Sequence, residues 1–356
     1  MPCTNYVKSS ARFSNRSSKS TLWLPLLSVL LLSALGLSTA RGAATPICQK
    51  DVPRITLANL SPPFKDYAYF QHCQAFPFEH AAATFSPVNA WWLAEIATLV
   101  YADETYSRQR LVEAGFRHIF FFDQAGTHAV AAANGRFAVV AFRGSEIWKR
   151  SDRFDPQQVF ADFRTNIDIR LSDWERGGRV HRGFKAALDV VWEEMLPEIE
   201  HFQDQGLTIW ITGHSLGAAL ATLAADRLQD VQGLYTFGSP RVGDQAFKAH
   251  FGLRAYRVVN GDDIVTSVPT RGPFHHVGKP VAIDSQGRLH HRSQSLGGPG
   301  EDPCAADASS ARAAREGLNI DPADLIPDAI RDHVPLLYAV YLWNALVDSQ
   351  ASSAAK

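Results

Sequence analysis

The chain has 356 residues, of which 46% are hydrophobic and 20% are charged, and its formal net charge at pH 7 is −1. This composition is that of a globular protein with enough chain to bury a large core, and it argues against an intrinsically disordered protein. A near-neutral charge without a basic stripe also argues against a nucleic-acid-binding protein, because nothing would neutralise the phosphates.

The first 40 residues have the pattern of an export signal. Residues 1–20 carry four basic side chains and no acidic one, and residues 21–40 are uncharged and rich in leucine. The small residues Ser38 and Ala40 allow cleavage after Ala40, although a stretch of this length could also remain as a membrane anchor. We expect cleavage, which leaves 31 basic against 36 acidic residues, a net charge of −5. Because the basic end stays in the cytoplasm, the rest of the chain is expected to be secreted or extracytoplasmic, or else anchored with the domain outside.

One of the four cysteines, Cys3, lies in the signal, which leaves Cys48, Cys73 and Cys304. An oxidising compartment permits one disulfide among these three and leaves one thiol. A bond between Cys48 and Cys304 would link the start of the mature domain to its end and is the pairing that we expect, while the two other pairings stay open. No Cys/His spacing resembles a zinc site, and no metal or organic cofactor is expected.

The first half of the mature chain predicts an irregular segment, one helix and three strands. Residues 41–88 are rich in Pro, Phe and Ala without a clear period, so we expect an irregular lead-in. Residues 89–102 carry apolar side chains at helical spacing. Residues 116–122, 127–132 and 136–142 are short apolar or alternating runs separated by turn residues, which is typical of strands joined by tight turns.

The second half alternates strands with helices. Helices are predicted over residues 183–201 and 336–346, strands over 231–237, 253–260 and 276–282, and a loose surface excursion over 290–325. This alternation predicts a largely parallel sheet with helices on both faces, within one domain over residues 89–350.

A strand, a tight turn and a helix are predicted in direct succession near the middle of the chain. Residues 213–217 read Gly-His-Ser-Leu-Gly and lie between an apolar run at 207–212 and an alanine-rich run at 218–225. This succession is typical of a nucleophile elbow, whose glycines let strand and helix pass close together and whose serine has a strained backbone. Ser215 would then present its hydroxyl at a helix N-terminus, which favours developing negative charge.

A serine nucleophile needs a histidine base and a carboxylate that orients the base. In α/β-hydrolase folds the partners follow in the order Ser, acid, His, each after a strand at the same edge of the sheet. Asp262 and Asp263 directly follow the predicted strand 253–260, and only one of them can face the site. Asp226 is expected to be a solvated helical residue, and Asp244 a loop or capping residue.

The base must come from the histidines beyond the elbow. These are His250, His275, His276, His290, His291 and His333. We expect His333, because Pro335 fits a first helical turn and disfavours a helix-interior position for His333, which leaves the imidazole on a loop. His276, at the start of a predicted strand, is the alternative.

An oxyanion hole requires two backbone N–H groups. One is expected from Leu216, which follows the nucleophile, and the other from an early loop at the end of a strand. Residues 139–145 fit the second role, since Gly144 allows close approach and Ser145 offers both an N–H and a hydroxyl.

Several ordered motifs carry a family resemblance. They are Phe-Arg-Gly-Ser at 142–145, Val-His-Arg-Gly-Phe at 180–184, Gly-His-Ser-Leu-Gly at 213–217, Thr-Phe-Gly-Ser-Pro-Arg-Val-Gly-Asp at 236–244, Asp-Ile-Val at 263–265 and Asp-His at 332–333. Together they resemble the successive blocks of the class 3 lipases, the fungal-type triacylglycerol lipase family, over about residues 89–346.

The resemblance implies an α/β-hydrolase fold with a central, mostly parallel sheet, helices on both faces and a lid segment. It implies Ser215 as nucleophile, Asp263 as acid and His333 as base, with Ser145 and Leu216 as the oxyanion hole. The family's acid directly precedes the Ile-Val pair, which selects Asp263 over Asp262. Thr266 departs from the family, because a proline commonly follows that pair.

The resemblance also implies a lid after Ser145 that opens at a lipid surface, although residues 146–165 are longer than the usual lid. Its apolar underside would come from Ile147, Trp148, Phe154, Val159 and Phe160, unless the segment is an ordinary partly buried loop. The expected function is that of an exported serine carboxylic-ester hydrolase acting through an acyl-enzyme at a lipid–water interface, foremost a triacylglycerol lipase. A phospholipase, a short-chain or aryl esterase, and a catalytically silent cell-surface binding protein are the alternatives on this fold.

Overall fold

The computed structural model describes residues 47–145, 170–270, 272–291 and 326–354. The predicted signal at 1–40, the predicted lid residues from 147 to 160 and most of the predicted excursion at 290–325 lie outside these ranges. None of the helices in the described ranges combines the length and the apolar character that a bilayer crossing requires.

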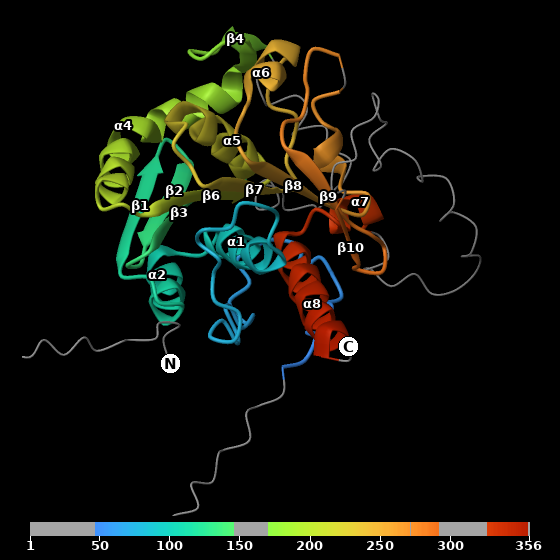
Figure 1. Cartoon of the computed structure of the whole chain (residues 1–356). Coiled ribbons are helices and arrows are strands. Elements are labelled where there is room, and N and C mark those ends of the chain that lie inside the picture. The colour runs from blue at the N-terminus through green and yellow to red at the C-terminus, as the bar shows by residue number, and fades with distance from the viewer. Residues whose placement is uncertain (1–46, 146–169, 271, 292–325, 355–356) are drawn as a thin grey trace, which may run out of the picture. The chain divides into compact units, whose positions relative to one another are not determined.

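A central sheet of eight strands carries the fold, in the order β1-β2-β3-β6-β7-β8-β9-β10 (Figure 1). The strands are β1 (His118–Gln124), β2 (Thr127–Ala133), β3 (Phe137–Phe142), β6 (Thr208–His214), β7 (Gly233–Phe237), β8 (Ala255–Asn260), β9 (Lys279–Ile283) and β10 (Leu289–His291). Strands β3, β6, β7, β8 and β9 run parallel to one another. At one edge β1 pairs antiparallel with β2 and β2 with β3, and at the other edge β10 pairs antiparallel with β9. This arrangement confirms the predicted α/β-hydrolase fold with its mostly parallel sheet.

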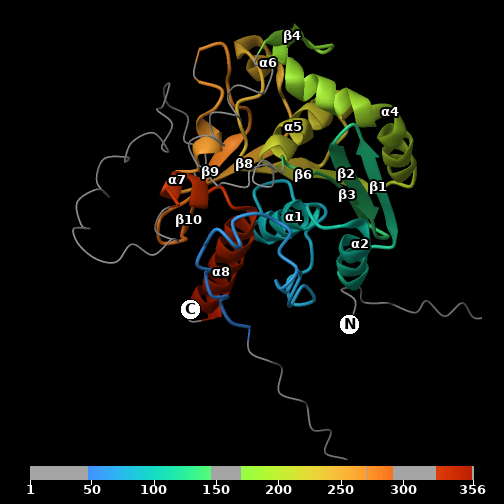
Figure 2. The same cartoon turned by 180° about the vertical axis from the view of Figure 1, so that it is seen from behind.

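Helices cover both faces of the sheet (Figures 1 and 2). One face carries α4 (Arg182–Asp204) and α5 (Leu216–Leu228), and the other carries α1 (Pro87–Leu99) and α8 (Pro335–Ala354). The smaller elements are α2 (Glu104–Glu113), α6 (Gln245–His250), α7 (Asp328–Arg331), the 3-10 helix η2 (Ile264–Ser267) and a separate hairpin of β4 (Leu171–Asp173) and β5 (Arg179–His181). Because both faces are covered, the central strands are buried along almost their whole length, and β3 is both buried and apolar at all six residues.

Residues 47–86 contain no helix or strand and pack on the C-terminal part of the domain. The apolar cluster between them comprises Ile55, Leu60 and Phe64 from this segment and Ile326, Ile330, Val334, Leu336, Leu337 and Val340 from α7, α8 and their flanks. The segment therefore supports the helix that follows the predicted base.

The predicted disulfide between Cys48 and Cys304 is wrong. Cys73 forms a disulfide, whereas Cys48 is exposed and does not, so the partner of Cys73 lies outside the described residues. Cys73 itself is 6% exposed.

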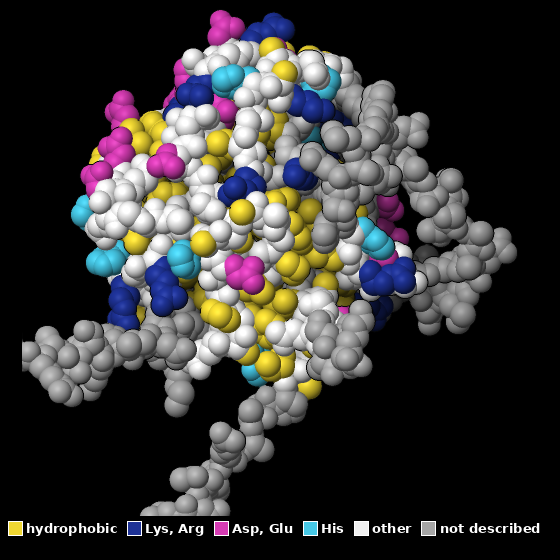
Figure 3. All heavy atoms as spheres, viewed as in Figure 1, with side chains coloured by type: hydrophobic (Ala, Val, Ile, Leu, Met, Phe, Trp, Pro, Cys, Tyr) yellow, Lys and Arg dark blue, Asp and Glu magenta, His cyan; other side chains and the backbone are white. Residues whose placement is uncertain are grey.

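Acidic side chains gather over α4 on the face shown in Figure 3, while Lys and Arg are scattered singly over that face. The outward side of α4 exposes Glu193, Glu194 and Glu200. This distribution agrees with the lack of a basic stripe in the sequence.

Candidate active site

The predicted elbow is present between β6 and α5. Ser215 has φ 59° and ψ −127°, a left-handed conformation that costs a non-glycine residue energy and that is typical of elbow nucleophiles. A Cβ atom at Gly213 would lie 2.3 Å from the carbonyl oxygen of Gly217, and one at Gly217 would lie 2.1 Å from that of Phe142. Only glycine fits at either position, so the turn brings Ser215 to the carboxyl edge of the sheet.

The side chains of Ser215, His333 and Asp263 come from distant parts of the chain and form one series of hydrogen bonds. The Nε2 atom of His333 lies 2.9 Å from the Ser215 hydroxyl oxygen. The Nδ1 atom of His333 lies 2.9 Å from each carboxylate oxygen of Asp263. A carboxylate only accepts hydrogen bonds, so Nδ1 of His333 donates and Nε2 is left to accept the hydroxyl hydrogen of Ser215. All three side chains are buried, with exposed fractions of 2%, 5% and 1% for Ser215, His333 and Asp263.

The carboxylate of Asp263 has two further donors. The backbone N–H of Val265 donates to Oδ1 at 2.9 Å, and the hydroxyl of Tyr338 donates to Oδ2 at 2.5 Å. Burial, followed by the charge of Asp263, raises the pKa of Tyr338 well above its ordinary value of 10.0, so this hydroxyl keeps its hydrogen. In the sequence, Tyr338 is one residue of the helix predicted over 336–346. A tyrosine within an apolar helix stripe was nevertheless a signal, because a buried hydroxyl needs a partner.

The two adjacent aspartates have different environments. Asp262 is exposed, and its backbone N–H donates to Oδ2 of Asp332 at 2.9 Å. Asp263 is the residue that faces His333. Thr266, the departure from the family pattern, donates its hydroxyl hydrogen to the carbonyl oxygen of Asp263 at 2.7 Å. Its side chain therefore holds the turn that carries Asp263.

The alternative base, His276, has another partner. Its Nε2 atom lies 2.8 Å from the carbonyl oxygen of Thr266 and donates to it. Burial, and next the charge of Arg257, lower the pKa of His276 well below 6.5, which keeps the ring neutral. The structure brings His333 rather than His276 to Ser215.

Two further aspartates, Asp244 and Asp226, were considered from the sequence, and only the prediction for Asp244 is confirmed. Asp244 was predicted to be a loop or capping residue. It caps the N-terminus of α6 and accepts the backbone N–H of Phe247. The prediction that Asp226 is solvated is wrong, because this residue is 0% exposed. Its Oδ2 atom accepts the indole N–H of Trp174 at 2.7 Å, which ties the β4–β5 hairpin to α5.

The two residues expected to form the oxyanion hole flank the elbow. Leu216 is the first residue of α5, where the backbone N–H groups have no partner within the helix. Ser145 follows β3, whose last residue Phe142 pairs with Gly213 in the parallel register. A Cβ atom at Gly144 would lie 3.1 Å from Cβ of Ser215, so the loop after β3 lies directly against the elbow.

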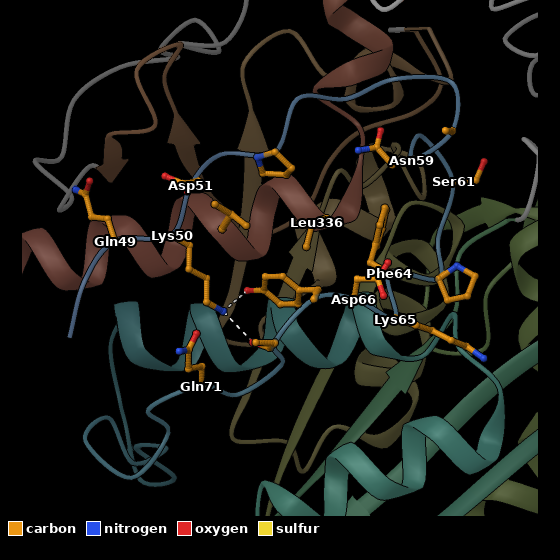
Figure 4. A pocket seen from close by; sticks show the side chains of 16 residues that line it. Gln49, Lys50, Asp51, Asn59, Ser61, Phe64, Lys65, Asp66, Gln71 and Leu336 are labelled. Atoms are coloured by element: carbon orange, nitrogen blue, oxygen red, sulfur yellow. Dashed lines mark hydrogen bonds between the residues drawn. The ribbon is translucent and has the colours of Figure 1, made fainter. Parts of the chain in front are cut away.

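A separate cavity of about 640 Å³ lies between residues 49–71 and α8 (Figure 4). Leu336 and Val340 of α8 line it, and the Lys50 ammonium donates to the Tyr67 hydroxyl and to the Ala68 carbonyl beside it. Ser215, Asp263 and His333 do not line this cavity. In the described part of the chain, no group of three or more His, Cys, Asp and Glu side chains is arranged to hold a metal ion.

Residues 139–272 match the protein family described as "Lipase (class 3)". The match confirms the resemblance predicted from the sequence. It includes Ser145, Ser215, Leu216 and Asp263, whereas His333 lies beyond it.

Curated relatives match part of the chain. Phospholipase A1-II 6 of Oryza sativa subsp. japonica is 38% identical over 187 residues, 44% of this chain and 46% of the relative. Secreted mono- and diacylglycerol lipase 1 of Fusarium solani is 38% identical over 117 residues, 29% of this chain and 34% of the relative. The chain thus spans about half the length of these relatives or less. Among solved structures, the triacylglyceride lipase of Rhizomucor miehei aligns with 48% of this chain and 67% of its own, with 26% identity and a TM-score of 0.40.

Proposed function

We propose that this chain, a member of the class 3 lipase family, is a serine hydrolase that cleaves carboxylic esters of lipids through an acyl-enzyme. The observation that carries the proposal is the continuous chain of hydrogen bonds from the Ser215 hydroxyl through His333 to the Asp263 carboxylate. A hydroxyl, an imidazole and a buried carboxylate in this order are the parts that activate a serine nucleophile.

In the proposed mechanism, Nε2 of His333 takes the proton of the Ser215 hydroxyl as its oxygen attacks the ester carbonyl carbon. The tetrahedral intermediate places negative charge on the former carbonyl oxygen, which the backbone N–H groups of Ser145 and Leu216 stabilise. His333 then gives its proton to the leaving alcohol, and the acyl group remains on Ser215. A water molecule activated by His333 releases the acid and restores the enzyme, while Asp263 stabilises the imidazolium in both steps.

The foremost substrate class is acylglycerols, as the family resemblance implies. Phospholipids are the second candidate, which is favoured by the similarity to the rice relative named Phospholipase A1-II 6. A panel of triacylglycerols and phospholipids of graded acyl length, given to the purified protein, separates the two. Release of fatty acid mainly from triacylglycerols supports the first candidate, and release mainly from the sn-1 position of phospholipids supports the second.

We also propose that the protein is exported. Support comes from the basic and then apolar pattern of residues 1–40 and from the disulfide at Cys73, because disulfides persist in oxidising compartments. Mass spectrometry of the protein recovered from the culture medium measures the mature N-terminus, which cleavage after Ala40 would place at Arg41.

The test of the proposed active site is Ser215→Ala, assayed on a nitrophenyl ester. Loss of the nucleophile is expected to lower kcat/KM by at least ~1,000-fold, since the triad acts as a unit. The matched control is Ser107→Ala in α2, a buried serine whose hydroxyl donates to the Leu99 carbonyl at 3.1 Å. This control is expected to keep full activity. Equal hydrolysis by the Ser215→Ala variant and the original protein would contradict the proposed active site, and a lack of hydrolysis by both would favour a binding protein on this fold.

A further inference from the structure

The last residue of β6, His214, is a buried histidine that the proposed triad does not use. It directly precedes Ser215 in the chain, and it is 2% exposed. The Nε2 atom of His214 lies 2.8 Å from the backbone carbonyl oxygen of His333, and its Nδ1 atom lies 2.9 Å from the hydroxyl oxygen of Tyr101. The ring centroids of His214 and His333 are 4.5 Å apart. His214 therefore joins the elbow directly to the residue proposed as base.

One protonation state of His214 satisfies both contacts. A carbonyl oxygen only accepts, so Nε2 carries the hydrogen that faces His333. Burial, and next the neighbouring His333, lower the pKa of His214 well below 6.5, while the bond to the His333 carbonyl acts in the opposite direction. The ring is thus neutral, its Nδ1 has a lone pair, and the Tyr101 hydroxyl donates to it.

Tyr101 also contacts the loop that leads to Ser145. It lies just after α1 and is 4% exposed. A Cβ atom at Gly144 would lie 2.0 Å from the Tyr101 oxygen and 2.7 Å from the His214 carbonyl oxygen. The Tyr101 hydroxyl is therefore packed between the loop after β3 and the imidazole of His214.

We propose that Tyr101 and His214 are positioning residues that fix the backbone at His333, and with it the imidazole that faces Ser215. The inference rests on the proposed function, because only there does His333 act as a base. Without the Tyr101 hydroxyl, Nδ1 of His214 loses its donor, and the ring is no longer held from both sides. The ring can then turn, which weakens the hydrogen bond from Nε2 to the His333 carbonyl oxygen and lets His333 move away from Ser215. A neutral His214 also avoids placing a second positive charge beside His333 when His333 holds the serine proton.

The kinetic test compares Tyr101→Phe with Tyr235→Phe on a nitrophenyl ester. Tyr235 in β7 is a matched control, because it is fully buried and its hydroxyl accepts the backbone N–H of Ser86 at 2.9 Å. The Tyr101→Phe variant is expected to lose about tenfold in kcat with KM unchanged, because a shifted base slows chemistry rather than binding. The Tyr235→Phe variant is expected to keep kcat within about twofold. Equal values of kcat in the two variants would overturn the proposal.

A second measurement does not depend on activity. The ring nitrogen chemical shifts of ¹⁵N-histidine-labelled protein report the tautomer of His214, and a His214→Gln variant assigns its signals by their loss. We expect the Nε2–H tautomer in both proteins, because the His333 carbonyl only accepts, and a shift of the Nε2 signal in Tyr101→Phe toward that of a more weakly donating N–H. An unchanged Nε2 shift in Tyr101→Phe would overturn the proposal even if the protein hydrolysed no ester. A lack of hydrolysis together with the expected shift would count against the proposed function alone.

Discussion

At Asp263, three donors converge on one buried carboxylate, and this arrangement decides how well His333 is oriented. The donors are Nδ1 of His333, the backbone N–H of Val265 and the hydroxyl of Tyr338. An ionised carboxylate with an exposed fraction of 1% must be compensated by such partners. The bond from Tyr338 is made to a charged group and is therefore stronger than a bond between neutral groups.

The substitution Tyr338→Phe removes this donor and keeps the ring. Hydrogen bonds to charged groups contribute about 1.5–3 kcal/mol to stability, so we expect the free energy of unfolding to fall by about 2 kcal/mol. We also expect kcat/KM to fall about tenfold, because Asp263 is then less firmly held against His333. Chemical denaturation and steady-state kinetics on a nitrophenyl ester measure the two effects.

The control for this prediction is Tyr341→Phe on the same helix. Tyr341 is partly buried and packs against the cluster formed by the lead-in and α8. Its substitution is expected to leave kcat/KM within about twofold, as is usual for a residue outside the reacting groups. A Tyr338→Phe variant as active as Tyr341→Phe would show that the bond to Asp263 does not orient the base.

At the scale of elements, periodicity identified the parts with a strong apolar pattern. The elbow strand and helix were predicted at 207–212 and 218–225 and form as β6 and α5, because both are buried and apolar. Helix α2 was not predicted, since only Ser107 and Leu111 of its ten residues are buried and no apolar stripe results. Helix α6 is six residues long, too short for its period to be recognised.

The residue types of the site and their order along the chain were predictable from the sequence. A glycine-flanked serine, an aspartate after a strand and a histidine before a helix are local patterns, and the structure brings these three residues together. The contacts of Tyr338, Tyr101 and His214 were not predictable, because each joins residues at least 75 positions apart. The partner of Cys73 was not predictable either, because three cysteines allow three pairings.

The lead-in has an ion pair that ties it to α1. Lys50 lies 3.5 Å from Glu95, whose side chain is 0% exposed. The same Glu95 carboxylate accepts the indole N–H of Trp91 at 2.8 Å and the hydroxyl of Tyr67 at 2.7 Å. A buried carboxylate in α1 thus organises an irregular segment that has no ladder of backbone hydrogen bonds of its own.

The substitution Lys50→Met tests how strongly this contact holds the lead-in. Removing one partner of a buried pair is destabilising, but Glu95 keeps its other donors, so we expect a loss of about 2 kcal/mol. For a protein of this size that loss lowers Tm by about 3 °C. Differential scanning calorimetry measures the change.

The matched control is Lys65→Met, since Lys65 lines the same cavity and pairs with Asp103 at 2.5 Å. The side chains of Lys65 and Asp103 are 51% and 52% exposed. Exposed pairs contribute roughly 0–1 kcal/mol, so Tm is expected to change by about 1 °C. If both variants melt alike, the burial of the Lys50 pair does not stabilise the lead-in.

For the whole molecule, the residue beside the proposed base gives stability a pH dependence. Burial, and then Asp263 and Asp328, raise the pKa of Asp332 from 3.8 to about 6, although the N–H of Asp262 and the charge of Arg331 oppose the shift. The folded protein therefore binds this proton more tightly than the unfolded chain does. The stabilising contribution is complete below about pH 4 and is lost as the pH rises through about 6.

The substitution Asp332→Asn should therefore stabilise the protein at neutral pH. An amide oxygen still accepts the N–H of Asp262, and the partly buried charge is gone. A fully buried group with this shift would give ~3 kcal/mol, and because Asp332 is partly exposed we expect about 1–2 kcal/mol. The gain in the free energy of unfolding should appear between pH 4 and 7 and remain constant above, as measured by urea denaturation at a series of pH values.

A control with the opposite sign exists in the β9–β10 hairpin. Burial acts to raise the pKa of Asp284, but hydrogen bonds from His290, Arg288 and Gln286 outweigh it, so the pKa lies below its ordinary value of 3.8. The contribution of Asp284 is present above about pH 4 and is lost as the pH falls further, so Asp284→Asn should destabilise the protein at pH 7 and approach the original protein in acid. The two difference curves must therefore slope in opposite directions with rising pH. A flat curve for Asp332→Asn would mean that this carboxylate titrates alike in the folded and unfolded chains, because a pKa that is the same in both states cannot make stability depend on pH.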